Sequence, residues 1–339
     1  MFAIAMATCS GLAAAQDTTA SPKRVGFLSG FGCSTDANPS PFRRRLAELG
    51  WVDGQTVILD CVSTVNLDQV DALAAELVAR RPDVLAAQPT NYVRALKQAT
   101  AKIPIVMVTI PNPVESGLVI DLGRPEANVT GVASSGREVA VKLIGLLKKL
   151  LPRLAKLAVI ERNGWDAGVH AQLEKDVTDA STKLEFAWQA FNPVTPEDYD
   201  AIFARLAAEG FDTAYVEPGP LLDANLVRVA GLAMRHRIPT FGNYPYYAEN
   251  GLLLAYGGDA DPLNERAADY VDKILRGAKP GNLPVTQPVK FNLEVKTRTR
   301  PELRTSPGPH VHSLRHFRHI PNQKRRGHLG GFYPRRPSR

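Results

Sequence analysis

An internal repeat restricts the folds open to this 339-residue chain more than any other feature. Residues 68–89 (DQVDALAAELVARRPDVLAAQP) align without a gap with residues 197–218 (EDYDAIFARLAAEGFDTAYVEP), at an offset of 129. Further on, residues 91–94 (NYVR) are echoed by residues 225–228 (NLVR). A repeat of this kind predicts two similar lobes. Part of the similarity has an alternative explanation, because all helix-strand units share the same pattern of apolar, polar and turn residues.

The order of elements within each copy predicts the class of fold. Short apolar runs punctuated by Gly, Pro or Asp indicate strands at residues 23–28, 56–61, 83–87 and 103–109. Amphipathic spacing between them predicts helices at residues 41–49, 67–81 and 91–101. Alternation of strand and helix implies parallel sheets with right-handed crossovers. The sequence therefore predicts an α/β protein with two Rossmann-like lobes.

Charge is distributed unevenly along the chain. Residues 296–339 contain twelve Lys and Arg residues and one acidic residue, which gives a formal charge of +11. Residues 1–295 contain 29 Lys and Arg residues and 33 acidic residues, which gives a formal charge of −4. A mildly acidic body gives no electrostatic reason to expect nucleic acid as a partner. The basic charges at residues 43–45 are predicted to lie on a solvated helix face, with contact to a membrane permease as the alternative.

Residues 296–339 are also rich in Arg, His, Pro and Gly and lack a sustained apolar period. Such a composition buries too little surface to order itself, so we expect this tail to lie outside the functional fold. A reading-frame slip would explain the change of composition. The alternative is a genuine basic arm that binds anionic surfaces or nucleic acid.

The N-terminus predicts export. Residues 2–15 carry no charge, and the Ala13–Ala15 run supplies the small residues of a cleavage site before Gln16, although no Lys or Arg precedes the apolar stretch. We therefore expect a signal peptide and short linker at residues 1–21 and a periplasmic location. A lipoprotein anchored at Cys9 is disfavoured, because apolar residues would follow the lipidated cysteine. No later stretch approaches the ~18 uninterrupted apolar residues of a membrane span.

The sequence shows no motif for metal binding or catalysis. After export only Cys33 and Cys61 would remain, and no CxxC or HExxH spacing occurs, so no metal site is expected. His170 and His236, the two histidines outside the tail, are isolated and are expected to be surface or hydrogen-bonded residues. GxGxxG, GxxxxGK[ST] and GxSxG are also missing, so we expect no cofactor and no catalytic residues.

Several segments, taken in order, closely resemble a known family of binding proteins. They are residues 42–55 (FRRRLAELGWVDGQ), 73–84 (LAAELVARRPDV), 97–106 (KQATAKIPIV), 112–118 (NPVESGL), 128–131 (NVTG), 270–280 (YVDKILRGAKP) and 283–291 (LPVTQPVKF). This pattern resembles the ABC transporter substrate-binding proteins of the tryptophan/tyrosine type. The resemblance implies a periplasmic-binding-protein type I fold, a ligand cleft at the hinge, and delivery of a small-molecule solute to an ABC permease without catalysis.

The resemblance also implies how the chain is divided. The chain is expected to cross between lobes near residues 128–131 and again near Tyr256 and Gly257. We therefore expect lobe 1 at 22–130 plus 257–285 and lobe 2 at 131–256 plus 286–295, in a protein that is a monomer. A small-molecule enzyme or a sensor domain on the same two-lobed scaffold is the alternative function. A sugar-repressor-like regulator is disfavoured, because a hydrophobic leader stands where its DNA-binding helices would lie.

The carboxyl ends of parallel strands form the ligand-facing edge of such sheets, and this rule nominates the site. The candidate ligand-binding residues are Ser29, Gly30, Gln88, Thr90, Thr109 and Asn112 from lobe 1, with Asn163, Trp165, Glu217, Asp223, Asn243 and Tyr244 from lobe 2. Hydroxyl groups and helix N-termini suit a carboxylate, whereas Glu217 or Asp223 suits an ammonium group. Aromatic residues suit an apolar side chain, so an amino acid or a similar amphipathic solute is expected.

Most of these residues also have a purely structural interpretation. Ser29, Thr90 and Asn163 are alternatively helix caps. Capping of the helix predicted near Leu226 is the preferred interpretation of Asp223 and Asn225. The aromatic residues are alternatively part of the core. Asn112 stands where the family pattern usually has Asp, which puts in doubt a preference for a cationic group there. Cys33 and Cys61 both lie near the carboxyl ends of neighbouring strands, so a disulfide between them is possible in an exported protein.

Overall fold

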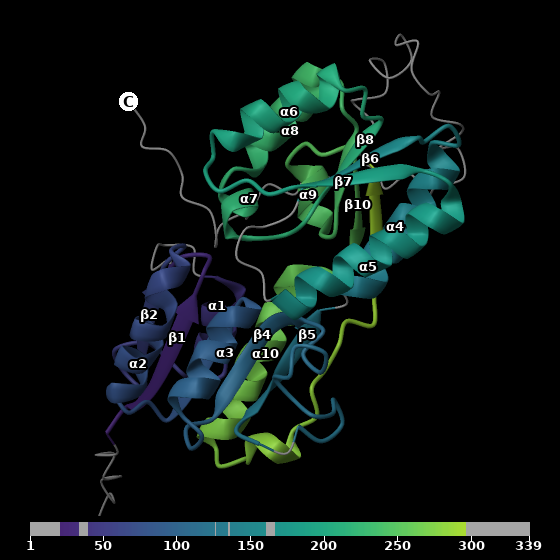
Figure 1. Cartoon of the computed structure of the whole chain (residues 1–339). Coiled ribbons are helices and arrows are strands. Elements are labelled where there is room, and N and C mark those ends of the chain that lie inside the picture. The colour runs from purple at the N-terminus through teal and green to yellow at the C-terminus, as the bar shows by residue number, and fades with distance from the viewer. Residues whose placement is uncertain (1–20, 34–39, 126, 135, 161–166, 296–339) are drawn as a thin grey trace, which may run out of the picture.

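The chain folds into two α/β lobes, each built on its own sheet (Figure 1). In this computed structural model, residues 21–33, 40–125, 127–134, 136–160 and 167–295 are described. The predicted leader and the basic tail therefore lie outside the described residues. Among the described residues, no helix combines the length and apolar character needed to cross a bilayer.

The first sheet is parallel throughout, with the strand order β2-β1-β3-β4-β5. Its strands are β1 (Lys23–Ser29), β2 (Val57–Ser63), β3 (Val84–Gln88), β4 (Ile105–Pro111) and β5 (Val129–Ser134). The helices of this lobe are α1 (Pro41–Glu48), α2 (Val70–Ala79), α3 (Thr90–Ala99) and α10 (Ala260–Leu275), with short 3-10 turns η1 (Leu67–Gln69) and η2 (Pro280–Asn282).

The second sheet repeats that order as β7-β6-β8-β9-β10 and adds β11 antiparallel to β10. Its strands are β6 (Lys156–Ile160), β7 (Ala187–Phe191), β8 (Thr213–Val216), β9 (Thr240–Gly242), β10 (Leu254–Gly257) and β11 (Asn292–Val295). The helices are α4 (Gly136–Leu150), α5 (Ala167–Leu184), α6 (Asp198–Ala208), α7 (Pro220–Ala224), α8 (Leu226–His236) and α9 (Pro245–Glu249). The shared order confirms the predicted duplication and the two-lobed α/β fold.

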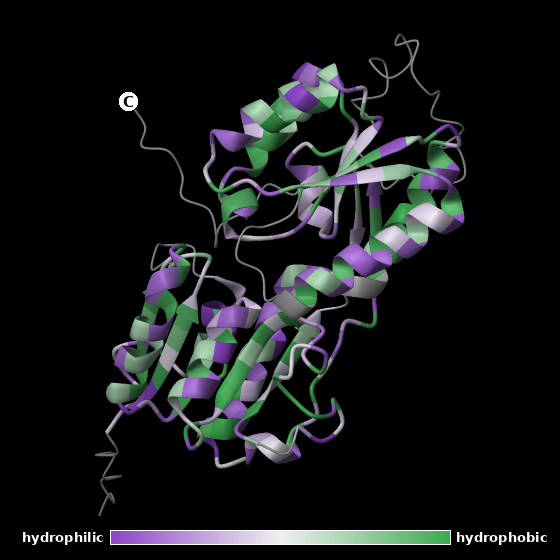
Figure 2. Ribbon diagram, viewed as in Figure 1, coloured by the Kyte–Doolittle hydropathy of each residue, from purple (hydrophilic) through white to green (hydrophobic). Residues whose placement is uncertain are grey.

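Helices cover both faces of each sheet, which explains why the central strands are apolar on both sides. All five residues of β3 are buried: Leu85 and Ala87 join the core beneath α2 and α3, whereas Val84 and Ala86 face α1 and α10. Hydrophobic residues accordingly run through the centres of both lobes and polar residues cover the outer helix faces (Figure 2).

Two helices pack on the sheet of the other half of the sequence. α4 follows β5 of the first sheet, yet its Leu143 and Leu147 lie in a core cluster with Leu157 of β6. Conversely, α10 follows β10 of the second sheet and contributes Ala267 and Val271 to the core of the first lobe. The chain crosses a third time before β11.

The strand pairing differs from the expected division in one detail. Gly131, Ala133 and Ser134 of β5 pair with β4, so the first sheet extends past residue 130 and the first crossing follows Ser134. Nothing in the composition of residues 129–134 (VTGVAS) breaks the strand at residue 130, and all six residues are buried. The expected boundary at residue 130 therefore falls inside a strand.

Polar contacts hold α10 on the first lobe. Arg44 pairs with Glu265 at 2.7 Å and Arg45 pairs with Asp269 at 2.8 Å. The indole nitrogen of Trp51 donates to Asp272 at 2.8 Å. Arg44 and Arg45 keep 40% and 36% of their side chains exposed, which agrees with the predicted solvated face, and they also bind the helix that returns from the second lobe.

Candidate functional site

The strand-end rule placed the candidate residues of the first lobe at one edge of its sheet. Ser29 and Gln88 are the last residues of β1 and β3, and both are buried. The backbone N–H of Gly30 donates to the carbonyl of Gln88 at 2.9 Å, which ties these neighbouring strand ends together. The Ser29 hydroxyl accepts from the N–H of Phe31 at 2.9 Å and therefore shapes the turn after β1.

The end of β4 has an unusual backbone. Thr109 and Asn112 both adopt positive φ values, 54° and 46°, and the register with β5 shifts between Met107 and Ile110. The Thr109 hydroxyl donates to the side-chain oxygen of Gln88 at 3.3 Å. A left-handed conformation is uncommon for a non-glycine residue and often marks a functional segment.

The start of α3 lies beside this edge. The Gln88–Pro89 peptide is cis, and Pro89 occupies the N-cap position without a side-chain capping bond. Thr90 is the first helical residue and is almost fully buried, with 1% of its surface exposed. Since the N-cap is Pro89, the alternative that Thr90 caps the helix is wrong.

In the second lobe, a buried cluster joins the ends of β8 and β9. The Tyr215 hydroxyl donates to a carboxylate oxygen of Glu217 and lies 2.8 Å from the side-chain oxygen of Asn243. Burial, reinforced by the charge of Glu217, raises the pKa of Tyr215 well above its usual value. The hydroxyl therefore keeps its proton and can hold the Glu217 carboxylate in place.

Asp223 in α7 is a second buried carboxylate at this edge. Its Oδ1 accepts hydrogen bonds from the hydroxyls of Tyr246 at 3.0 Å and Tyr247 at 2.8 Å. Capping of α8 was the preferred interpretation of both Asp223 and Asn225, and it is wrong for Asp223. Asn225 does occupy the N-cap position, but it makes no side-chain capping bond, and its side chain donates to the Leu221 carbonyl at 2.8 Å.

Tyrosines surround Asp223. The ring of Tyr244 stacks on that of Tyr246 with centroids 5.6 Å apart, and Tyr246 meets Tyr247 edge-on at 4.7 Å. Tyr244 and Tyr246 are half-buried against the core of the second lobe. Their rings therefore combine a packing role with an aromatic surface beside a carboxylate.

The two edges meet at Gly30. A β-carbon on this glycine would lie 2.9 Å from Cδ of Pro89, 3.2 Å from Cζ of Tyr92 and 3.0 Å from Cγ of Pro220. Pro220 is the first residue of α7 and stands in the sequence between Glu217 and Asp223. The start of α3 and the segment of the second lobe that carries Glu217 and Asp223 thus meet at one point of contact between the lobes.

Other expectations have mixed outcomes. Asn163 and Trp165 lie outside the described residues. Cys33 and Cys61 form a disulfide with a Cα–Cα distance of 5.8 Å. His170 pairs with Glu174 at 3.4 Å on one helix, and no group of three potential metal ligands occurs in the described ranges.

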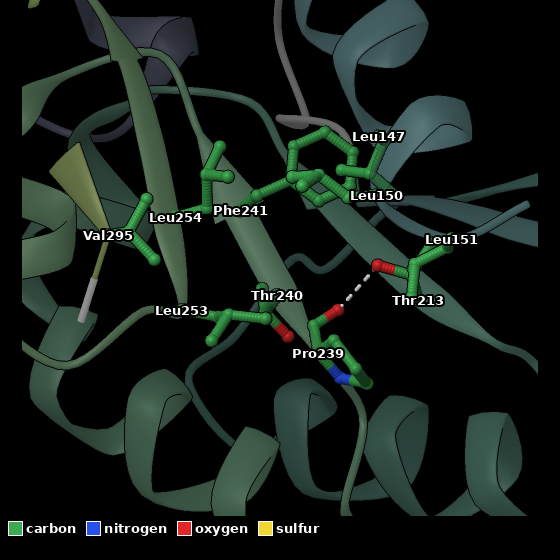
Figure 3. Close-up of a pocket in the computed structure, with 10 residues that line it drawn as sticks. All are labelled: Leu147, Leu150, Leu151, Thr213, Pro239, Thr240, Phe241, Leu253, Leu254 and Val295. Carbon is green, nitrogen blue, oxygen red and sulfur yellow. Dashed lines mark hydrogen bonds between the residues drawn. The ribbon is translucent and has the colours of Figure 1, made fainter. Parts of the chain in front are cut away.

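An apolar pocket lies at the opposite edge of the second sheet (Figure 3). It is lined at the starts of β8, β9 and β10 by Thr213, Thr240 and Leu254, and by Leu147 and Leu150 of α4. Ligand-facing edges of parallel sheets are the carboxyl ends of the strands, so this pocket is separate from the candidate site.

Sequence reasoning missed three residues of the site. Tyr215 holds Glu217, yet its position inside a strand resembles that of any core aromatic residue. Pro89 and Pro220 lie at the junction between the lobes, and no sequence pattern indicated that they meet. Contacts between segments far apart in the sequence leave no local pattern.

Comparison with known proteins agrees with this architecture. A tyrosine-binding protein of Clostridioides difficile (strain R20291) is 26% identical over 255 residues, which is 75% of this chain and 72% of that protein. A conserved domain protein of Vibrio cholerae has a solved structure with a TM-score of 0.72 and 24% identity, covering 83% of this chain and 94% of that chain.

A second solved structure, the ABC domain from Streptococcus pneumonia in complex with L-Trp, has a TM-score of 0.71 and 21% identity. It covers 83% of this chain and 94% of that chain, and at such identities the two solved structures establish the fold alone. The sequence model described as ABC transporter substrate binding protein matches residues 32–303, most of the chain. The chain therefore belongs to the ABC transporter substrate binding protein family.

Proposed function

We propose that this protein is the extracytoplasmic solute-binding component of an ABC importer, which captures a small amphipathic solute between its lobes and delivers it to a membrane permease. It acts as a monomer after export, binds no nucleic acid and catalyses no reaction. Family membership supports the binding role, and the formal charge of −4 outside the tail supports the lack of a nucleic-acid partner.

The observation that carries this proposal is the convergence of two equivalent sheet edges. Both sheets have the same order, and their carboxyl ends approach each other at Gly30 and Pro220. Hinged closure of two such edges removes a solute from water, which strengthens every polar contact made to it. The buried polar residues Gln88, Glu217 and Asn243 lie at these edges rather than in the lobe centres.

The chemistry of the two edges supports an amino acid as the solute. Glu217 and Asp223 suit an ammonium group, and the half-buried rings of Tyr244 and Tyr246 suit an apolar or aromatic side chain. The relative named as a tyrosine-binding protein and the structure solved with L-Trp agree with an aromatic amino acid. We therefore place aromatic L-amino acids first among the solutes to test.

A thermal-shift screen of the full chain against L-amino acids, sugars and polyamines tests the proposal. A solute at 100 times its Kd should stabilise the native state by about 2.7 kcal/mol. Mass spectrometry of the solute after release should recover it unchanged. Chemical conversion of the bound solute would show that the protein is an enzyme. A screen in which no solute of any class raises the melting temperature would contradict a binding role.

A further inference from the structure

Two exposed valines occupy the same position in the two halves of the chain. Val65 and Val194 both stand three residues before the aligned stretch of the repeat, at its offset of 129, and they are 75% and 64% exposed. Other identities at this offset have a packing reason, since Leu77 and Leu206 are fully buried. A single apolar residue on a surface needs no explanation. The same valine exposed in both halves needs one, because burial does not account for it.

Acidic residues follow both valines at the same spacing. In each half one acid stands three residues and another six residues after the valine, namely Asp68 and Asp71 in the first half and Glu197 and Asp200 in the second. Arg228 pairs with both acids of the second half at 3.3 and 2.6 Å, so that pair is partly neutralised. Each lobe therefore presents an apolar side chain beside carboxylates, which fits an apolar socket bordered by cations.

Both valines lie on the side of the lobes away from the chain crossings. Val65 follows β2 and Val194 follows β7, and each of these strands is the outermost one of its sheet. The crossings follow β5 and β10, toward the other side, and Figure 1 shows β2 and β5 at opposite sides of the first lobe. Both valines also follow the carboxyl ends of their strands, which is the edge that holds the candidate solute site.

The turns that carry the valines are fixed by hydrogen bonds. In the first lobe, the N–H of Thr64 donates to the Ser29 carbonyl at 3.2 Å, and the Thr64 carbonyl accepts from the Tyr92 hydroxyl at 2.6 Å. In the second lobe, Oδ2 of Asp198 accepts from the N–H groups of residues 194–195 at 2.8 and 2.7 Å. A side chain on a turn held in this way loses little conformational freedom when a partner binds it.

We infer that Val65 and Val194 are the two points at which the lobes dock on the membrane permease, each entering an apolar socket bordered by cationic residues. This inference rests on the proposed function and names the surface of each lobe that the permease recognises. A substrate-binding protein of an ABC transporter works with a membrane permease, and a permease that meets the same residue on both lobes needs two equivalent sockets.

Solute uptake by cells tests the docking surface. Cells of the strain that encodes the protein, with the chromosomal copy deleted, receive the full chain or a variant, and the initial rate of uptake of radiolabelled L-tryptophan is measured. Val65→Lys and Val194→Lys each bring a cation to a cationic socket and should lower the rate about 10-fold. Asp68→Asn combined with Asp71→Asn should lower it about 3-fold, because charges at the rim of an interface mainly set the rate of association.

Each lobe offers a matched control at the opposite edge of its sheet. Ile120 is 73% exposed and lies two residues after Leu118, whose carbonyl accepts from Lys97 near the end of α3. Met234 is 47% exposed and lies in the last turn of α8. Ile120→Lys and Met234→Lys should leave the rate of uptake unchanged.

A second measurement separates docking from damage to the solute site. The affinity for L-tryptophan in titration calorimetry, and the melting temperature, should keep their wild-type values in every variant, because the changed side chains lie outside the candidate solute site. Wild-type uptake by Val65→Lys and Val194→Lys, or an equal loss in the two controls, would overturn the inference and leave the proposed function standing. If the wild-type protein binds L-tryptophan but does not restore its uptake, the importer assignment fails and the inference fails with it. If the wild-type protein binds no solute, the proposed function itself is overturned.

Discussion

Asp223 shows how single residues prepare the site of the second lobe. The buried carboxylate is held by two tyrosine hydroxyls, and Tyr247 is fully buried whereas Tyr246 is half-buried. Tyr247→Phe leaves a buried charge with one hydrogen bond fewer, so the free energy of unfolding should fall by about 1.5–3 kcal/mol. Tyr246→Phe, the matched control, should cost less than about 1 kcal/mol, because the Tyr246 side chain is already half-exposed to water. Urea unfolding measures both, and equal losses would refute this account of Asp223.

The sequence identified which residues reach the sheet edges but not what they contact there. Ser29, Gln88, Glu217 and Asn243 follow from strand ends alone, because parallel strands bring their carboxyl ends to one edge. The partners of Asp223 could not be predicted, since Tyr246 and Tyr247 lie more than twenty residues away and hydrogen-bonding partners at such distances leave no periodic signal. The preference for helix capping there followed from local rules that tertiary contacts overrode.

At the scale of elements, α10 is the helix whose placement the structure explains best. Asp272 of α10 contributes most to the polar contacts that hold this helix on the first lobe. Its carboxylate accepts a hydrogen bond from the Trp51 indole at 2.8 Å and pairs with Arg276 at 2.6 Å, and 15% of its side chain is exposed. Asp272→Ala removes both contacts and should lower the free energy of unfolding by about 1–3 kcal/mol in chemical denaturation. Glu265→Ala breaks a more exposed pair and should cost about 0–1 kcal/mol. The reverse order would refute the central place given to Asp272, and no loss in either variant would show that α10 is held by its apolar face alone.

The boundaries of strands and helices were predictable where strand-breaking residues flank them. Gly, Pro and Asp mark the ends of β1 to β4, and the predicted strands agree with the observed ones to within about two residues. Periodicity indicates that α10 has an apolar face but cannot say which sheet covers it. The packing of α4 and α10 on the opposite lobe therefore required the tertiary structure, and so did the extension of β5 to Ser134.

At the scale of the whole molecule, Gly30 limits how closely the lobes approach. Gly30→Ala would place its methyl group 3.0 Å from Pro220, so the closed arrangement should become less populated. Solute affinity measured by titration should fall about 10-fold, equivalent to ~1.4 kcal/mol in the balance between open and closed forms. Combining Gly30→Ala with Pro220→Ala should restore part of the affinity. The same loss in both backgrounds would locate the effect within the first lobe, at Pro89 and Tyr92.

Closure of the two lobes around one unaltered solute is the proposed action of the whole molecule. It can be tested by titration calorimetry of the full chain with an aromatic L-amino acid at several temperatures. We expect one solute per chain, a negative heat-capacity change from the apolar surface buried on closure, and complete recovery of the amino acid afterwards. Turnover of the amino acid, or saturable binding without any heat-capacity change, would refute this mode of action.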